Sequence, residues 1–281
     1  MERKSKKEDL NQPPIVKHEV LRVKLREDSI ESVIDEIVVE DKIDVYINGE
    51  HYAAFTLLPS DIKELIIGHL LSEGIISRIE MVNDLKISEK KADVYVDKVK
   101  ILALKKPRII LAGCGGSWKV PAQLWMKPKG SRNSSPIKVS SETIMKASKI
   151  LNSMAKVYRR TGGTHASALL DENGKLLALS EDISRHNAVD KVIGKAALNN
   201  VDFRRTLLAS TGRLTSEIVI KAANMEVPII VSISAPTDKG IKIAEIAGIT
   251  LIGFTRGKRF NIYANPHRIL GNPDRFALGC C

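Results

Sequence analysis

The sequence predicts a layered α/β protein whose C-terminal half contains at least three roughly parallel strands. Residues 165–264 alternate short apolar runs with segments of helical periodicity, an order typical of a sheet covered by helices. In addition, 43% of the 281 residues are hydrophobic, which is enough to fill a substantial core. A smaller α+β region is expected to precede this sheet.

Four segments are expected along the chain. They are a disordered basic arm (1–14), an N-terminal α+β region (15–112), a mobile loop (113–139) and a C-terminal α/β domain (140–281). The arm is charged and no apolar core follows it, so it does not fit a secretory signal. Apolar runs such as "ELIIGHLLSEGII" are shorter than the ~20 residues that a spanning helix needs. We therefore expect no membrane crossing and a cytoplasmic location.

A β-hairpin is predicted at residues 35–58, because apolar and polar residues alternate on both sides of Asn48-Gly49. Further strands are predicted at 92–106 and 108–113, where the residues are mainly apolar or alternate.

A helix is predicted between these strands and the hairpin. Ser60 suits its N-cap, Asp61 its first turn, and Gly74 its end. His69 falls on the apolar face of this helix, where a packed core histidine is more common than a ligand.

A second helix is predicted from Ser141 to the glycine pair Gly162-Gly163. Its inward side chains are expected to be Ile144, Ile150, Leu151, Met154 and Val157. After it, strands are predicted at 165–171, 175–180, 206–210, 228–234, 249–254 and 259–264, and helices from His186, Thr215 and Asp238.

Three of these strand ends are followed by small, hydroxylic and basic residues. The chain runs from "LLAS" into "TGRLTSE", from "VSIS" into "APTDKG" and from "LIGF" into "TRGKR". Ligands of such sheets bind beyond the carboxyl ends of the strands, near the N-termini of the following helices. We therefore expect Thr211, Gly212, Arg213 and Arg256 to receive a phosphate group. The alternative is that Gly, Ser, Thr and Pro are common in strand-to-helix turns of any protein.

Residues 180–194, "SEDISRHNAVDKVIG", carry closely spaced charges of alternating sign. Two interpretations stay open at this point. Glu181 and Asp182 fit first-turn acids that face the positive end of a helix dipole. The same stretch also fits a functional site with perturbed ionisation.

Three cysteines, Cys114, Cys280 and Cys281, are too few for a disulfide framework. Cys114 lies where a strand gives way to a long segment without periodicity, a position typical of an exposed thiol, although a lone cysteine is more often a small buried hydrophobe. His165 follows a glycine pair and is expected to face the same crevice. Because Ser167 stands where a zinc deaminase needs glutamate, no metal site is expected.

The net charge of +11 permits an anionic partner such as nucleic acid, a nucleotide or an acidic protein. Aromatic residues make up only 4% of the chain, so stacking platforms for single-stranded nucleic acid are scarce. Charge alone does not choose among these partners.

Seven blocks of the sequence, taken in order, resemble the FdhD-type formate dehydrogenase accessory family. They are "YINGEHYAAFTLLPSDIKELIIGHLLSEGII", "GCGGS", "TGGTHASALL", "SEDISRHNAVDKVIG", "STGRLTSEIVIKAA", "SAPTDKGIKIAE" and "LIGFTRGKRFNIYANPHRI". The resemblance implies a cytidine-deaminase-like α/β core without the deaminase zinc site, and a homodimer. It also implies a sulfur carrier, or sulfurtransferase, that takes a persulfide from a cysteine desulfurase. The acceptor would be molybdenum bis(molybdopterin guanine dinucleotide), before its insertion into formate dehydrogenase.

The resemblance assigns roles to individual positions of this chain. Cys114 matches the persulfide cysteine of the family. The cofactor-binding segment matches Phe254, Thr255, Arg256, Gly257, Lys258 and Arg259. Residues expected to border the same crevice are Thr211, Gly212, Arg213, His165, Arg185 and His186.

Two departures from the family pattern stand out. Ser117 occupies the position of a second cysteine that many members carry, so a local disulfide relay is not possible here. Ile183-Ser184 replaces a Val-Gly pair. Two other functions also remain open: a nucleotide-binding cofactor chaperone without sulfur transfer, and a basic nucleic-acid-binding protein, which salt-sensitive binding would reveal.

Overall fold

A six-stranded mixed sheet forms the centre of the C-terminal half of the molecule, in the order β10-β9-β11-β12-β13-β14. The structure is a computed structural model that describes residues 13–97, 108–110 and 135–270. The strands are β9 (His165–Asp171), β10 (Leu176–Asp182), β11 (Thr206–Ser210), β12 (Ile229–Ser232), β13 (Thr250–Arg256) and β14 (Arg259–Ala264). Strands β11, β12 and β13 are mutually parallel, which confirms the predicted parallel core.

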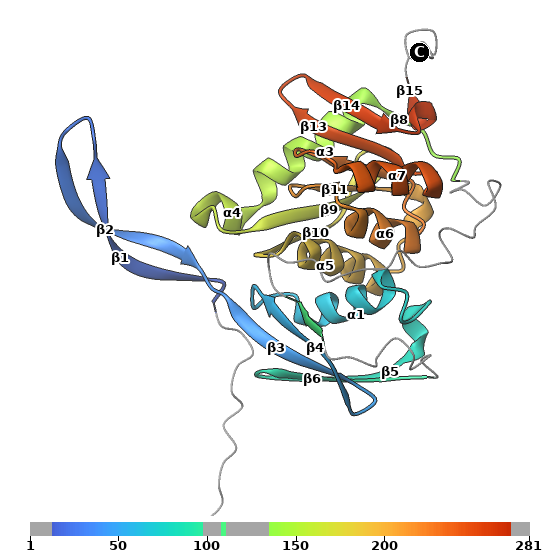
Figure 1. Cartoon of the computed structure of the whole chain (residues 1–281), viewed down its shortest axis with the longest axis horizontal. Coiled ribbons are helices and arrows are strands. Elements are labelled where there is room, and N and C mark those ends of the chain that lie inside the picture. The colour runs from blue at the N-terminus through green and yellow to red at the C-terminus, as the bar shows by residue number, and fades with distance from the viewer. Residues whose placement is uncertain (1–12, 98–107, 111–134, 271–281) are drawn as a thin grey trace, which may run out of the picture.

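Helices cover both faces of this sheet (Figure 1). One face carries α3 (Ser141–Met154), and the other carries α5 (Arg185–Leu198), α6 (Ser216–Asn224) and α7 (Asp238–Ala247). Successive residues of a strand point to opposite faces. On β9, Ala168 and Leu170 therefore belong to the core beneath α3, while Leu169 belongs to the core shared with α5.

A five-stranded sheet packs against α1 (Ile62–Ser72) in the N-terminal half, in the order β5-β6-β3-β4-β7. Its strands are β3 (Asp41–Ile47), β4 (Glu50–Leu57), β5 (Val82–Ser88), β6 (Lys91–Val96) and β7 (Arg108–Ile110), and a short 3-10 turn, η1 (Ile79–Met81), precedes β5. The predicted hairpin is confirmed, with Asn48 and Gly49 at positive φ in its turn.

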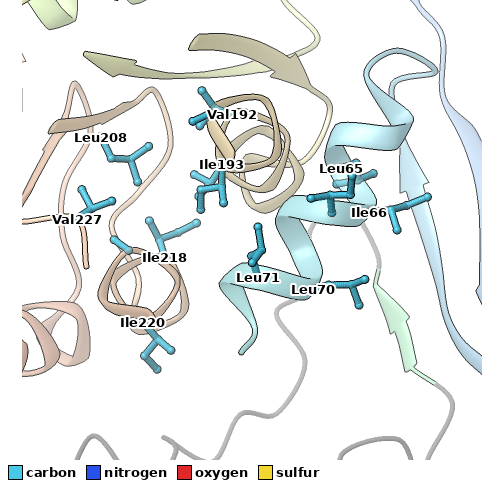
Figure 2. Packing of buried hydrophobic residues seen from close by; sticks show 14 of the residues in the cluster. Leu65, Ile66, Leu70, Leu71, Val192, Ile193, Leu208, Ile218, Ile220 and Val227 are labelled. Atoms are coloured by element: carbon cyan, nitrogen blue, oxygen red, sulfur yellow. The ribbon is translucent and has the colours of Figure 1, made fainter. Parts of the chain in front are cut away.

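The two halves share one hydrophobic core through the contact between α1 and α5. Figure 2 shows Ile66 of α1 pointing toward an N-terminal strand and Val192 of α5 pointing toward the large sheet, and both belong to one hydrophobic cluster. The helices approach closely because both carry glycine at the crossing. A methyl group on Gly68 would overlap the Asp190 carbonyl, and one on Gly194 would overlap the Glu64 carbonyl.

A two-stranded ribbon, β1 (Ile15–Lys24) and β2 (Ser29–Val38), projects from the body of the molecule (Figure 1). These residues lie in the expected N-terminal region, but the sequence pattern did not predict the ribbon. At the far end of the chain, a second small sheet pairs β8 (Val139–Ser140) with β15 (Ile269–Leu270). Two further 3-10 turns are η3 (Phe203–Arg205) and η4 (Pro266–Arg268).

Three local expectations were wrong. The N-cap of α1 is Asp61, in a left-handed conformation, and not Ser60. The helix predicted from Ser141 ends at Met154, and α4 (Lys156–Thr161) begins after Ala155, whose ψ of 83° is not helical. Because the chain changes direction there, Met154 lies at the surface, with 44% of it exposed, and does not point into the core.

Candidate functional site at the sheet edge

Three loops meet at the edge formed by the carboxyl ends of β11, β12 and β13. Hydrogen bonds join the first two loops: Ser232 Oγ donates to the Gly212 carbonyl at 2.7 Å, and Leu214 N–H donates to the Ala235 carbonyl at 3.0 Å. Phe254 N–H reaches the Ser234 carbonyl at 3.0 Å and joins the third loop. The predicted juxtaposition of the three strand ends is therefore present as one hydrogen-bonded edge.

His165 lies beside the first of these loops. β9 runs antiparallel to β11, so the start of β9 reaches the same edge as the end of β11. The Nδ1 atom of His165 is 3.1 Å from Thr211 Oγ1, which also accepts a hydrogen bond from Ala166 N–H at 3.0 Å. The threonine hydroxyl thus fixes the orientation of the imidazole ring.

Arg185 crosses the backbone of the same loop at Gly212. A Cβ atom on Gly212 would lie 2.7 Å from Arg185 Cβ and 2.9 Å from Arg185 Cδ, so only glycine leaves room for this side chain. The Nε atom of Arg185 is buried and has no hydrogen-bond partner among the described residues. A buried cationic donor without a partner is costly, and it is satisfied when an anion binds.

The helices α5 and α6 begin at this edge. Their N-cap residues are Ser184 and Thr215, and neither hydroxyl caps its own helix. Both hydroxyl oxygens are buried without a hydrogen-bond partner in the described part of the chain. By contrast, Thr237 at the start of α7 accepts from Gly240 N–H at 3.1 Å. The first-turn amides and free hydroxyls of α5 and α6 are therefore suited to an anion.

The electrostatics of this edge are cationic around His165. Burial lowers the pKa of His165, and the positive charges of Arg185, His186 and Arg213 lower it further. Burial also lowers the pKa of Arg185, with a further contribution from Arg213. Burial first, and these neighbours second, therefore favour the neutral imidazole of His165. We refer to Arg185 and Arg213, together with the adjacent His165 and His186, as the cationic cluster.

One carboxylate that the sequence pattern did not single out belongs to this edge. Glu217, in the first turn of α6, has an oxygen 3.0 Å from His186 Nε2, and its charge also favours the ionised form of Arg185. The sequence feature that could have identified Glu217 is its place two residues after the N-cap Thr215. Acids are common at that position in any helix, so the feature is not specific. The role of Glu217 becomes visible only once α5 and α6 are known to begin side by side.

The predicted segment from Phe254 to Arg259 forms a second group at the same edge. Phe254 has a positive φ of 52°, and Gly257, in the turn between β13 and β14, has a φ of 64°. Thr255 is buried, and its carbonyl accepts a hydrogen bond from Ser148 Oγ. The side chains of Arg256, Lys258 and Arg259 are exposed, and the Arg256 guanidinium lies 5.4 Å from the centre of the Phe254 ring.

The charged stretch 180–194 has two separate parts. Glu181 is the penultimate residue of β10 and accepts from Val157 N–H and Tyr158 N–H, so it caps α4 and not the helix that follows it in sequence. Asp182 forms a fully buried ion pair with Lys191, 2.6 Å apart. Both acids are structural, but neither is a first-turn acid of α5, so that interpretation was wrong in its detail. Arg185 and His186 lie at the sheet edge, and a functional role for them stays a prediction.

A second buried polar network joins α5 to α1 and α6. Asp190 accepts from Lys221 Nζ at 2.9 Å and from Ser72 Oγ at 2.7 Å, and it lies 2.9 Å from His69 Nδ1. Burial alone would raise the pKa of Asp190, but Lys221 and His69 lower it to about 2. His69 is thus a core histidine, as predicted, with Tyr52 Oη at 2.9 Å from its other nitrogen.

Several predicted features lie outside the described residues, among them Cys114, Ser117, Cys280, Cys281 and most of the loop 113–139. The described end of that loop is packed, because Ile137 is buried and Ser135 Oγ donates to the Arg204 carbonyl. Within the described ranges, no group of three His, Cys, Asp or Glu side chains is placed to hold a metal ion. None of the described helices is long and apolar enough to cross a membrane.

Comparison with known proteins finds relatives that all belong to one family. A family model described as the FdhD/NarQ family matches residues 38–270. The sulfur carrier protein FdhD of Methanothermobacter thermautotrophicus is 34% identical over 244 residues, covering 87% of this chain and 95% of the relative. The protein of the same name from Bacillus subtilis is 37% identical over 244 residues, covering 85% and 92%.

A similar fold occurs in a crystal structure assigned to a formate dehydrogenase accessory protein from Desulfotalea psychrophila. The two chains superpose with a TM-score of 0.73 at 23% identity, over 92% of this chain and 100% of the other. At this identity the likeness establishes the mixed α/β fold alone.

Proposed function

The chain belongs to the FdhD/NarQ family, and from this premise we propose that it is a sulfur carrier for a molybdenum cofactor. Cys114 receives a persulfide sulfur from a cysteine desulfurase. The acceptor is molybdenum bis(molybdopterin guanine dinucleotide), destined for a molybdenum-dependent formate dehydrogenase. The observation that supports this proposal most directly is the cationic cluster at the carboxyl edge of the large sheet, because the acceptor is rich in phosphate.

The loading step needs one nucleophilic thiolate. The Cys114 thiolate attacks the outer sulfur of the desulfurase persulfide, the sulfur–sulfur bond of the donor breaks, and the donor cysteine leaves as a thiolate. Cys114 then carries the outer sulfur, with no net oxidation. Release of that sulfur as sulfide takes two electrons. Since Ser117 has no thiol, we assign this step to a thiol reductant from outside the chain.

The acceptor is a substrate of this protein and is proposed to bind through its diphosphate groups. Arg185 Nε, Arg213 and the first-turn amides of α5 and α6 would receive one diphosphate at the cationic cluster. The exposed side chains of Arg256, Lys258 and Arg259 would contact a more distal part of the molecule. Glu217 keeps His186 in place by their 3.0 Å contact.

Three finer expectations accompany this proposal. The α/β core would share the layering of cytidine deaminases, the protein would act in the cytoplasm, where thiols stay reduced, and it would form a homodimer. They rest on the family resemblance.

Complementation tests the function. In a host that has lost its own family member, the wild-type chain should restore formate dehydrogenase activity and Cys114→Ala should not. Ser117→Ala is the matched control and should restore activity. Activity restored by Cys114→Ala would instead favour a cofactor chaperone without sulfur transfer.

Calorimetry with guanosine diphosphate tests the site. Arg213→Ala should weaken binding about 10- to 150-fold, the scale of one hydrogen bond to a charged group, about 1.5–3 kcal/mol. Arg256→Ala should have a smaller effect, since its side chain is exposed. The control Arg204→Ala, at the opposite edge of the sheet, should leave the affinity unchanged. Equal affinity in all three variants, or no binding by the wild type, would exclude this site. Salt-sensitive RNA binding in its place would favour a nucleic-acid-binding protein.

A further inference from the structure

The ribbon formed by β1 and β2 exposes large aliphatic side chains that no described residue covers. Leu21, Val23, Ile30 and Ile34 are 73%, 58%, 68% and 63% exposed, and we call these four residues the distal patch. Leu25, in the adjoining turn, is 90% exposed. Single exposed aliphatic residues are ordinary, but a contiguous apolar patch on a projecting element marks an interaction surface.

The register of the two strands places the distal patch on one face. Val23 lies opposite Ile30, Leu21 lies opposite Ser32, and Ile34 lies opposite Glu19. Between each of these cross-strand pairs and the next lies a pair whose side chains point to the opposite face. The three pairs therefore share one face of the ribbon. That face has its own polar contact, since Ser32 Oγ donates to a Glu19 carboxylate oxygen.

The same face packs against the body of the molecule at the base of the ribbon. There the guanidinium of Arg160 in α4 donates two hydrogen bonds to the Glu36 carboxylate, at 2.7 and 2.5 Å. Val38 lies against Gly163, so closely that a Cβ atom on the glycine would lie 2.5 Å from Val38 Cγ1. Further along the ribbon this cover ends, because the ribbon projects past the body (Figure 1).

A two-stranded ribbon that leaves one face bare is marginal by itself, because three strands or a packed face are needed for independent stability. No described residue of the chain supplies that face for the distal patch.

The charge of the ribbon indicates what this cover is. Residues 15–38 contain four Lys or Arg side chains and six Asp or Glu side chains, while the whole chain has a net charge of +11. The ribbon is thus an acidic element on a strongly basic molecule. The contact between Glu36 and Arg160 shows that its acids do bind cations of this body. Among the described residues, Glu36 to Arg160 is the one ion pair between the ribbon and its own body, and the body of a second copy offers the same basic surface.

We propose that the distal patch is covered by a second copy of this chain, with each ribbon lying across the body of its partner. Such an exchange is two-fold symmetric, so every contact is made twice. Each ribbon has two strands of ten residues, close to the roughly 20–30 residues that one side of a standard interface uses. This inference rests on the homodimer of the proposed function and assigns its contact surface; it does not depend on sulfur transfer.

Sedimentation velocity over a concentration series tests the proposal on the full chain. The wild type should be a dimer at micromolar concentration. The double variant Ile30→Lys/Ile34→Lys should raise the dissociation constant at least a hundredfold, because two buried aliphatic side chains per ribbon are lost and positive charge is placed against a basic partner. Val16→Lys, on the opposite face of β1, is the matched control and should change it less than tenfold. Unchanged thermal melting of the body would show that the double variant is folded.

Cross-linking of a mixture of unlabelled and ¹⁵N-labelled protein separates the outcomes. Lys17 and Lys24 of the ribbon should appear in cross-links of mixed isotope composition, which can form only between copies. Two results would overturn the role of the ribbon but leave the homodimer standing. One is a dimer in which neither lysine forms a mixed cross-link, and the other is a dimer that persists in the double variant. A monomeric wild type would overturn both, and a different protein bound at the patch would overturn the choice of partner.

Discussion

The carboxylate of Asp190 connects three helices. It lies on α5 and contacts His69 and Ser72 of α1 and Lys221 of α6. The apolar helix face predicted that His69 is a core histidine, but the acid that faces it lies 121 residues away, beyond the reach of any local pattern. The same limit applies at the candidate site on the sheet edge. Thr211 to Arg213 were predicted because parallel strands end together. Glu217 and Thr215 can be assigned to the site only once α5 is known to begin beside α6.

Asp190→Asn should destabilise the protein by about 3–5 kcal/mol at pH 7, the usual cost of breaking a buried ion pair. The pKa of Asp190 is about 2 in the folded chain, below its ordinary value of 3.8. The ionised form therefore stabilises the fold at pH values above about 4, and this contribution, about 2 kcal/mol, is lost as the pH falls toward 2. Urea denaturation across this range should show the two proteins converging at low pH. A constant difference at every pH would contradict the assignment.

Anion binding should raise the pKa of His165. The free imidazole is held neutral by burial and by three cationic neighbours, Arg185, His186 and Arg213. A bound anion offsets those charges, so the complex takes up a proton and its affinity increases as the pH falls through the pKa of the bound form. NMR titration of the imidazole with and without sulfate should show this rise, and His165→Gln identifies the resonance. An unchanged pKa at saturating sulfate would place the anion elsewhere.

At the scale of elements, sequence periodicity predicted the strands and helices between 165 and 264 in the right order. Each of them is long enough, and buried enough on one face, for local pattern to determine its type. The break at Ala155 was missed because its cause is not local: the Glu181 carboxylate binds the first amides of α4 and begins a new helix there. The ribbon was missed because both of its faces mix apolar and charged residues, which hides the alternation of a half-buried strand.

The crossing of α1 and α5 should not tolerate a single added methyl group. Gly68→Ala places its Cβ atom into the backbone carbonyl of Asp190, so the helices must separate and the polar network between them opens. We expect a loss of about 3 kcal/mol or more, despite the better helix propensity of alanine. Lys63→Ala, at an exposed position of α1, should change the stability by less than about 0.5 kcal/mol. Chemical denaturation compares the two, and equal stabilities would show that the helices do not cross as described.

At the scale of the whole molecule, the five-stranded sheet, α1 and the layer of α5, α6 and α7 stack into one body whose core is continuous (Figures 1 and 2). The Asp182 to Lys191 pair and the Asp190 network fix α5 in this stack. As a result, these buried ion pairs, which belong to the same charged stretch 180–194, hold Arg185 and His186 at the sheet edge. A rigid anion site at this edge, as we propose, would suit a carrier that must hold a large acceptor while a cysteine delivers sulfur.

The measurement that tests the central claim most directly is mass spectrometry of the full chain after incubation with a cysteine desulfurase and cysteine. We predict a mass increase of one sulfur atom that maps to Cys114. It should be absent in Cys114→Ala and should persist in Ser117→Ala and in a Cys280→Ser/Cys281→Ser double variant. Sulfur found on Cys280 or Cys281 with Cys114 unmodified, or no transfer to any cysteine, would contradict the proposed sulfur carrier.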